Sequence, residues 1–248
     1  MIKDLEYFIK NKIFTEKYLL KKRLDRAVKN NYEAELSYID KFSDASKFAI
    51  DVGVYRGVYS YKLSKLFSHV YSFEPNPLIS SYLTKNLPKI INNVTIMNYA
   101  LSDSNGDVYL KIPKRSKSIF KQNVEEIYRL GLATIHKSNK MENFENFKVK
   151  KKKLDDLDIN KKKIGFIKID VEGHEKEVII GAEKLIIESK PTMLIEIENR
   201  HTQKPVIETV NYIRNLGYNS YFLKNNKLID IEKLSVDDKN NNFIFTPK

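Results

Sequence analysis

The stretch Phe48-Ala-Ile-Asp-Val-Gly-Val-Tyr-Arg-Gly-Val-Tyr-Ser60 decides the fold of this chain. A short apolar run delivers an acid, Asp51, and two glycines, Gly53 and Gly57, then open a segment with helix-like spacing. A second apolar run ends in Glu74, 23 residues beyond Asp51. Glycines let the backbone turn tightly against a ligand, and an acid at the tip of the next strand accepts hydrogen bonds from both ribose hydroxyls. The pattern therefore predicts a nucleotide-binding βαβ unit for an adenosine-bearing cofactor.

The spacing of the glycines indicates which cofactor is bound. A dinucleotide site normally has the pattern G-x-G-x-x-G, because a pyrophosphate sits on bare amide groups at the helix N-terminus. Here the spacing is Gly53-x-x-x-Gly57, and Tyr55 and Arg56 stand where a pyrophosphate needs room. Asp51 suits a cationic ligand such as S-adenosylmethionine, whose amine and sulfonium are both positive. These residues favour a methyl donor over a nicotinamide cofactor.

Composition places the chain among ordinary globular proteins. Its 248 residues are 42% hydrophobic and 31% charged, which is enough apolar material for one large domain, or for one domain with an appendage. The chain has no cysteine, so disulfides, thiolate metal sites and a cysteine nucleophile are excluded. The first twenty residues lack an uninterrupted apolar core, and no stretch approaches the roughly 20 apolar residues of a membrane span. A cytoplasmic protein is the expectation.

The net charge of +12 raises the question of a nucleic-acid partner. Only seven of the 44 basic residues are arginine, the residue best suited to bidentate readout of phosphate and guanine. The lysine runs at 150–153 and 161–163 flank predicted strands and are typical of solvated loops. We therefore expect no nucleic-acid partner, with a role for the lysine runs toward an anionic substrate as the alternative.

The order of predicted elements gives a doubly wound α/β sheet. Residues 1–43 are predicted to be a helical extension, and 44–248 a domain with a long loop or small helical insertion at 113–146. Within the domain, helices are predicted at 77–87, 175–188 and 204–216, besides the one that the glycines open. Strands are predicted at 48–51, 70–73, 94–98, 108–112, 147–152, 164–169, 192–197, 218–223 and 242–246.

Acids follow several of the predicted strands at one edge of the sheet. Asp51, Glu74 and Asp170 each end a strand, and Glu196 and Glu198 lie near the end of a fourth. In an open α/β sheet the ligand binds beyond the carboxyl ends of the strands. A single acid of this kind is as often a helix cap as a ligand, but five together predict one shared crevice.

The motif Asp170-Val-Glu-Gly-His-Glu175 carries the candidate chemistry. Gly173 allows a left-handed turn, and His174 lies at the mouth of the crevice, where an imidazole can act as a general base. His174 as a helix residue bonded to a neighbouring carboxylate is an equally weighted reading, and His201 is similarly placed. No histidine or cysteine pair indicates zinc. Carboxylates alone are nonspecific, so a magnesium site of Asp170 and Glu198 remains a weak alternative and no metal is expected.

The successive motifs resemble those of the FkbM-type methyltransferases over about residues 33–200. The matching segments are Asp51–Ser60, Tyr71–Pro77, Asn98–Asp103, Ile167–Glu175, Gly181-Ala182 and Leu194–Glu198. One departure is Val54-Tyr55, where the family usually has Ala-Asn. Tyr55 is expected to narrow the methionine end of the cofactor pocket or to change a hydrogen bond there. The resemblance implies the class I methyltransferase sheet with an antiparallel last strand, and O-methyl transfer from S-adenosylmethionine onto sugars or secondary metabolites.

On this reading each candidate residue has a role. Asp51, Gly53 and Gly57 are expected to hold the methionine portion, Glu74 the ribose, and the Asn98–Asp103 segment the adenine, with Asp103 as its main side chain. Asp170 belongs to the cofactor site and, with His174 and His201, to the candidate bases. Residues 1–43 and 113–146 are expected to form the acceptor site. The acceptor is expected to be a hydroxyl of a sugar, glycan or glycan precursor.

Two other classes of protein remain open. A nucleic-acid (RNA) methyltransferase would use the same donor site and the positive charge, although the chain lacks an Asn-Pro-Pro-Tyr-type motif. A non-catalytic adenosine-binding protein would keep Glu74 and need no base near Asp170. Salt-dependent RNA binding supports the first class, and donor binding without turnover supports the second.

Overall fold

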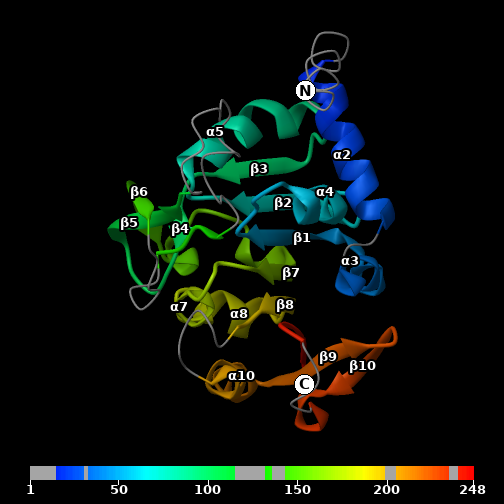
Figure 1. Ribbon diagram of the computed structural model, residues 1–248. Helices are drawn as coiled ribbons and strands as arrows, with labels where there is room; N and C mark the ends of the chain where they lie inside the picture. The colour runs from blue at the N-terminus through cyan, green and yellow to red at the C-terminus, as the bar shows by residue number, and fades with distance from the viewer. Residues whose placement is uncertain (1–14, 31–32, 115–131, 136–142, 199–204, 235–239) are drawn as a thin grey trace.

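The computed structural model describes residues 15–30, 33–114, 132–135, 143–198, 205–234 and 240–248. The strands of the main sheet are β1 (Asp44–Val52), β2 (Phe67–Phe73), β3 (Val94–Met97), β7 (Ile164–Ile169), β8 (Thr192–Glu196), β9 (Tyr218–Lys224), β10 (Lys227–Asp230) and β11 (Asn242–Pro247). The helices are α2 (Glu16–Asn30), α3 (Ala34–Tyr38), α4 (Val58–Leu63), α5 (Pro77–Asn86), α7 (Glu175–Ile180), α8 (Glu183–Ser189) and α10 (Val206–Asn215). Figure 1 shows how they are arranged.

The main sheet has the predicted doubly wound topology. Its strand order is β10-β9-β11-β8-β7-β1-β2-β3. The pairs β1–β2, β1–β7, β2–β3 and β7–β8 are parallel, whereas β11 is antiparallel to both β8 and β9. The predicted antiparallel last strand is thus confirmed. β7 is a central strand between β1 and β8.

Each face of the main sheet has its own hydrophobic core, because side chains alternate between the two faces along a strand. On one face, strand residues such as Ile50 and Ile167 pack against α7, α8 and α10. On the other face, residues such as Ala49, Phe166 and Leu194 pack against α2, α3 and α4. The described part of the expected N-terminal extension therefore covers the second face of the sheet.

A second, three-stranded sheet lies beside the main one (Figure 1). It consists of β4 (Ala100–Leu101), β5 (Gly106–Pro113) and β6 (Phe144–Lys152), with β6 in the middle. The sequence predicted strands near β5 and β6 but not their separation from the main sheet. Of the expected insertion at 113–146, residues 115–131 and 136–142 lie outside the described residues. Thr134 exchanges two backbone hydrogen bonds with Lys111 of β5.

Two details of the C-terminal half differ from the sequence prediction. The single helix predicted at 175–188 is two helices, α7 and α8. A Cβ at Gly181 would lie 1.9 Å from the backbone oxygen of Ser102, and the Asp155 carboxylate accepts hydrogen bonds from the first turn of α8. The strand predicted at 218–223 also continues into a hairpin with β10. Asn225 and Asn226, both with positive φ, form its turn, as a two-residue type I′ loop requires.

Within the described ranges, no helix combines the length and the apolar character needed to cross a membrane.

Candidate functional site

The loop between β1 and α4 depends on two glycines with left-handed backbone angles. Gly53 has φ +85 and Gly57 has φ +77, a region that L-residues other than glycine rarely enter. A Cβ at Gly53 would lie only 1.7 Å from the backbone oxygen of Asp170, so the two strand-end loops touch through bare backbone. Gly57 instead precedes the first residue of α4, and a Cβ there would meet Leu83 and Leu87.

Asp51 lies beneath the site, in the interior of the sheet. Its side chain is buried and accepts a 2.5 Å hydrogen bond from the Ser60 hydroxyl, which lies 2.8 Å from the hydroxyl of Ser72. Burial raises the pKa of Asp51 to about 6, against the lowering effects of Ser60 and Lys168. The carboxyl group thus joins β1 to α4 and β2 and supports the loop from below.

Glu74 follows β2 and holds the glycine loop from the side. One carboxylate oxygen accepts the backbone N–H of Tyr55 at 2.8 Å, and the other accepts that of Asn76 at 2.9 Å. Tyr55 has φ +47, a left-handed angle for a residue with a bulky side chain. Burial raises the pKa of Glu74 to about 7, although both backbone hydrogen bonds act to lower it.

A cleft of about 650 Å³, counted with its open mouth, lies at the carboxyl edge of the main sheet. Glu74, Asp170 and His174 supply polar groups at its surface. Its apolar walls include Phe73, Tyr99, Leu101, Leu110, Ile135 and Val171, which come from both sheets and from the two loops around them. A planar apolar ring with a polar edge is the kind of ligand that such walls accommodate.

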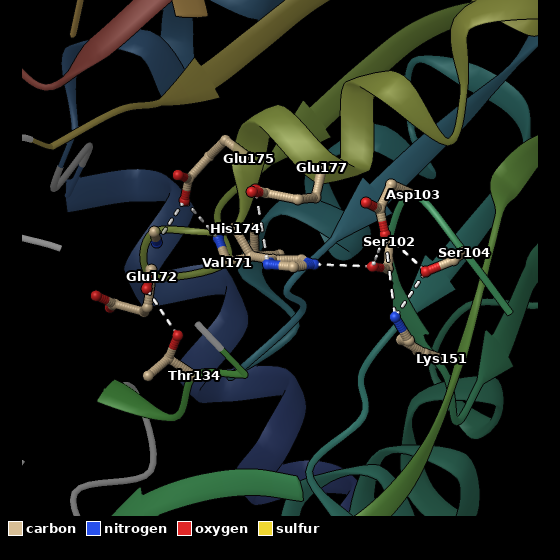
Figure 2. Close-up of polar contacts among 11 residues, drawn as sticks. Ser102, Asp103, Ser104, Thr134, Lys151, Val171, Glu172, His174, Glu175 and Glu177 are labelled. Carbon is tan, nitrogen blue, oxygen red and sulfur yellow. Dashed lines mark hydrogen bonds and ion pairs between the residues drawn. The ribbon is translucent and has the colours of Figure 1, made fainter. Parts of the chain in front are cut away.

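A chain of polar contacts leads from His174, which lines the cleft, to Lys151 (Figure 2). His174 Nε2 lies 3.0 Å from the Ser102 hydroxyl, which donates to Asp103 at 3.0 Å. Because the Ser102 hydroxyl donates its hydrogen to Asp103, it accepts a hydrogen bond from the Nε2–H group of His174. The Ser104 hydroxyl also donates to Asp103 and is the main cause of the lowered pKa of Asp103. Lys151 Nζ donates to Ser104 at 2.7 Å.

The loop after β7 is held by contacts from two directions (Figure 2). Glu172 and Gly173 both have positive φ, and the Glu175 carboxylate accepts the Gly173 N–H at 2.9 Å and the Val171 N–H at 3.3 Å. Burial raises the pKa of Glu175 to about 7. From the other side, the Thr134 hydroxyl donates to the Glu172 carbonyl at 2.8 Å. Thr134 and its neighbours thereby complete the wall of the cleft.

A buried lysine lies beside the cleft, on the face of the sheet that α2, α3 and α4 cover. The side chain of Lys168 is 1% exposed, with Nζ 3.3 Å from Asp170 Oδ2 and 4.9 Å from the centre of the Tyr59 ring. Burial alone would lower the pKa of Lys168, but the charges of Asp170, Glu196, Glu33 and Asp51 outweigh it and raise the pKa. The lysine is therefore a permanent positive charge among carboxyl groups.

The structure brings five of the predicted site residues together at the cleft and leaves the others outside. The residues that line it are Gly53, Tyr55, Glu74, Asp170 and His174. Asp51 and Gly57 support the loop from behind, Asn98 is exposed beyond β3, and the exposed Asp103 reaches the cleft through Ser102. His201 lies outside the described residues. The described side chains contain no cluster of three or more histidine and acidic groups that could hold a metal ion.

Several residues of the site were not predicted from the sequence. Ser102 is inside the predicted adenine segment, but nothing in the pattern distinguishes it from its neighbours. Thr134 comes from the expected insertion, where no periodicity places a residue. Lys168 did carry a signal, because a charged residue inside a continuous apolar strand must find buried partners.

The topology and the cleft together define a class I methyltransferase fold. Its marks are the antiparallel strand β11 between β8 and β9, and the acid Glu74 after β2. The family model of the methyltransferase FkbM domain matches residues 51–220. The chain therefore belongs to the FkbM family of S-adenosylmethionine-dependent methyltransferases, as its motifs predicted.

Solved structures with a similar fold include several methyltransferases. Methyltransferase FkbM from Methylobacillus flagellatus KT is 16% identical with a TM-score of 0.49, and the match covers 81% of this chain but only 44% of that one. A tRNA (m1A58) methyltransferase from Aquifex aeolicus is 13% identical over 86% of this chain and 67% of its own, with a TM-score of 0.44. A Streptococcus mutans protein in complex with SAH is 12% identical over 86% and 97%, with a TM-score of 0.45. No curated protein matches the chain.

The residues of the cleft fit S-adenosylmethionine. Each carboxylate oxygen of Glu74 accepts one backbone N–H and keeps a second lone-pair direction for a ribose hydroxyl. The bare backbone at Gly53 leaves space where a side chain would collide with Asp170. The apolar walls suit an adenine ring, and the carboxyl groups at the edge suit a positive charge.

Proposed function

We propose that this protein transfers the methyl group of S-adenosylmethionine to a hydroxyl of a sugar, glycan or glycan precursor. The observation that carries the proposal is the set of carboxyl groups around Lys168, on the covered face of the sheet beside Asp170. Asp170 pairs with Lys168, and Glu196 is the neighbour of Asp170 in the β7–β8 register. Glu33 accepts a hydrogen bond from Tyr59, whose ring covers the lysine. Glu35 and Glu198 act electrostatically on this group. Carboxyl groups, ionised or protonated, form hydrogen bonds with the hydroxyls of neutral polyols.

Within this proposal, the residues of the cleft hold and orient the donor. Glu74 binds the ribose hydroxyls, Gly53 allows the methionine portion to pass, and the chain from His174 to Asp103 borders the adenine. The bound cofactor supplies a methyl carbon on a sulfonium, so most of the rate acceleration comes from positioning the acceptor oxygen in line with it. The hydrogen bond between His174 Nε2 and Ser102 favours the structural reading of His174 over its reading as the base. A cytoplasmic location is part of the proposal.

A panel of acceptors tests the proposed function. The full-length protein is incubated with S-adenosylmethionine and, in parallel, methyl glycosides, nucleotide sugars, phenols and total RNA, and release of S-adenosylhomocysteine is measured. We expect turnover with one or more of the sugars. Turnover confined to phenols or to RNA contradicts the proposal.

The RNA alternative has one specific observation in its favour. The outer face of the second sheet carries Tyr109, which is 61% exposed, with Lys148 opposite it on β6 and Lys150 two residues further along that strand. An exposed aromatic ring among lysines is one form of single-strand binding surface. If it serves that purpose, RNA binds below micromolar Kd at physiological salt. We expect instead nonspecific binding at about 10⁻⁴–10⁻⁶ M, because Asp107 already pairs with Lys148.

A further inference from the structure

Asp170 and Glu196 lie next to each other at the carboxyl edge of the main sheet. β7 and β8 are parallel, and their last paired residues are Ile169 and Ile195. The next position on each strand is therefore Asp170 and Glu196. Lys168 and Asp170 are two residues apart and point to the same face, and Glu196 joins them there because Leu194 is on that face. The two carboxyl groups are therefore neighbours, and the negative charge of Asp170 acts on Glu196.

Charged groups from several elements face this pair. Lys168 lies below it on β7, and Asp51 of β1 acts on the lysine from the neighbouring strand. Tyr59 of α4 covers the lysine with its ring, and its hydroxyl donates to Glu33, which immediately precedes α3. Glu35 of α3 interacts electrostatically with Lys168, and Glu198 beyond β8 interacts electrostatically with Glu196.

A buried amide oxygen next to Glu196 marks a place for a hydroxyl group. Asn242 of β11 is the cross-strand partner of Glu196, so their side chains share one face. Its Oδ1 atom is buried, and within the described part of the chain no donor reaches it. Buried acceptors are normally paired, by protein or by a bound molecule. A second hydroxyl of a polyol whose reacting hydroxyl lies at Glu196 would donate to this oxygen.

We propose that Glu196 is the catalytic base for the acceptor hydroxyl and that Lys168 is the positioning residue that holds the Asp170–Glu196 pair in place. The inference rests on the proposed function. As the acceptor oxygen bonds to the methyl carbon, the carbon–sulfur bond breaks with its electron pair on sulfur, and the hydroxyl proton passes to the Glu196 carboxylate. The sulfonium becomes a neutral thioether, and the proton leaves Glu196 to solvent after the product departs.

The electrostatics of the site agree with this geometry. Burial, followed by the negative charge of Asp170, raises the pKa of Glu196 to about 8, while Lys168 acts to lower it. A base with this pKa is well matched to proton uptake near neutral pH. It also gives a pH signature distinct from that of an unperturbed histidine, whose pKa is about 6.5.

The titration of Glu196 tests the pair without any acceptor. Protein labelled with ¹³C at the glutamate δ-carbons is titrated by NMR, and the Glu196 resonance is identified by its absence in Glu196→Gln. We expect a midpoint near 8. Because an opposite charge lowers the pKa of a carboxyl group and a like charge raises it, Lys168→Met should raise the midpoint and Asp170→Asn should lower it. A midpoint near the ordinary 4.5, or no response to either substitution, overturns the proposal.

Turnover on methyl glycosides tests the catalytic role. We expect kcat of the parent protein to rise with pH through an apparent pKa near 8, and Glu196→Gln to lower kcat roughly 10²- to 10⁴-fold. Affinity for S-adenosylhomocysteine should stay within about twofold, since the donor groups are untouched, whereas a merely structural role would change both. Glu188→Gln, an exposed glutamate on α8, is the matched control.

Failure of the two proposals can be told apart. If Glu196→Gln keeps the parent's kcat, or if the rise lies near pH 6.5, the role of Glu196 is wrong while sugar methylation stands. If the parent protein methylates no glycoside, the proposed function is wrong and the role of Glu196 falls with it, whatever midpoint the NMR titration finds.

Discussion

Replacing Glu74 with glutamine removes one charge from the cofactor site while nearly keeping the size of the side chain. In the structure both carboxylate oxygens accept a backbone N–H, one from Tyr55 and one from Asn76. An amide has one acceptor oxygen, so one of these N–H groups would face an NH₂ donor. Leaving a buried N–H without a partner costs about 1–3 kcal/mol. We expect the free energy of unfolding of Glu74→Gln to fall by that amount.

The effect on donor binding follows from the same carboxylate. Loss of a hydrogen bond to a charged group costs about 1.5–3 kcal/mol, which is roughly 10- to 100-fold in affinity. With a pKa of about 7, Glu74 is ionised in only about a tenth of the molecules at pH 6 and in about nine-tenths at pH 8. Affinity of the parent protein should therefore rise roughly tenfold across this range, and that of Glu74→Gln should stay flat.

Calorimetric titration at pH 6, 7 and 8 measures both effects. S-adenosylhomocysteine is the main ligand, and adenosine, which carries the ribose diol without the amino-acid portion, isolates the contact of Glu74 with the ribose. Urea denaturation gives the stability change, and Glu188→Gln serves as the exposed control. The reasoning is wrong if Glu74→Gln binds within twofold of the parent at pH 8, or if the parent's affinity is equal at pH 6 and pH 8.

Three further perturbations follow from the described contacts. Gly53→Ala places a Cβ 1.7 Å from a backbone oxygen, so it should abolish donor binding and lower Tm. Gly217 also has a positive φ but open space around it, so Gly217→Ala should lower the free energy of unfolding by only about 1–2 kcal/mol. Equal losses of Tm in the two variants contradict the steric argument. The pKa values of Glu74 and Glu175 are raised to about 7 from 4.5, so the folded state keeps protons that the unfolded chain releases. That stabilisation is complete below about pH 4.5 and is lost as the pH rises through 7, so the urea midpoint of the unliganded protein should be lower at pH 8 than at pH 5; the reverse order contradicts it. His174→Ala should weaken S-adenosylhomocysteine binding several-fold and leave the pH dependence of kcat unchanged. If kcat of this variant no longer rises with pH, the imidazole of His174 is the base.

The sequence predicted the strands and the loop glycines well because both are local properties. The apolar runs gave the strand ends within a few residues, and the positive φ values at Gly53 and Gly57 are the ones that only glycine adopts easily. It could not say which face of β1 borders the cleft. Side chains alternate along a strand, so Asp51 and its neighbour Val52 point in opposite directions, and Val52 is the one that lines the cleft.

The other features that the sequence did not predict depend on contacts between residues that are far apart in the chain. The pairing of β5 with β6 joins strands on either side of the expected insertion, and no local pattern assigns that pair to a separate sheet. The break between α7 and α8 is similar, because it depends on the approach of Gly181 to Ser102 and on a cap supplied by Asp155. Helix propensity across 175–188 carries no trace of either contact.

Asp170 connects the two halves of the site. Its backbone oxygen lies against Gly53 in the donor loop, and its side chain pairs with Lys168 and Glu196 on the opposite face. Because the Gly53 contact is backbone against backbone, a shift of the donor loop cannot be absorbed by a rotamer change and must move the tip of β7. On the proposed mechanism, this contact ties the position of the carboxyl pair, and with it the geometry for proton uptake, to the donor loop.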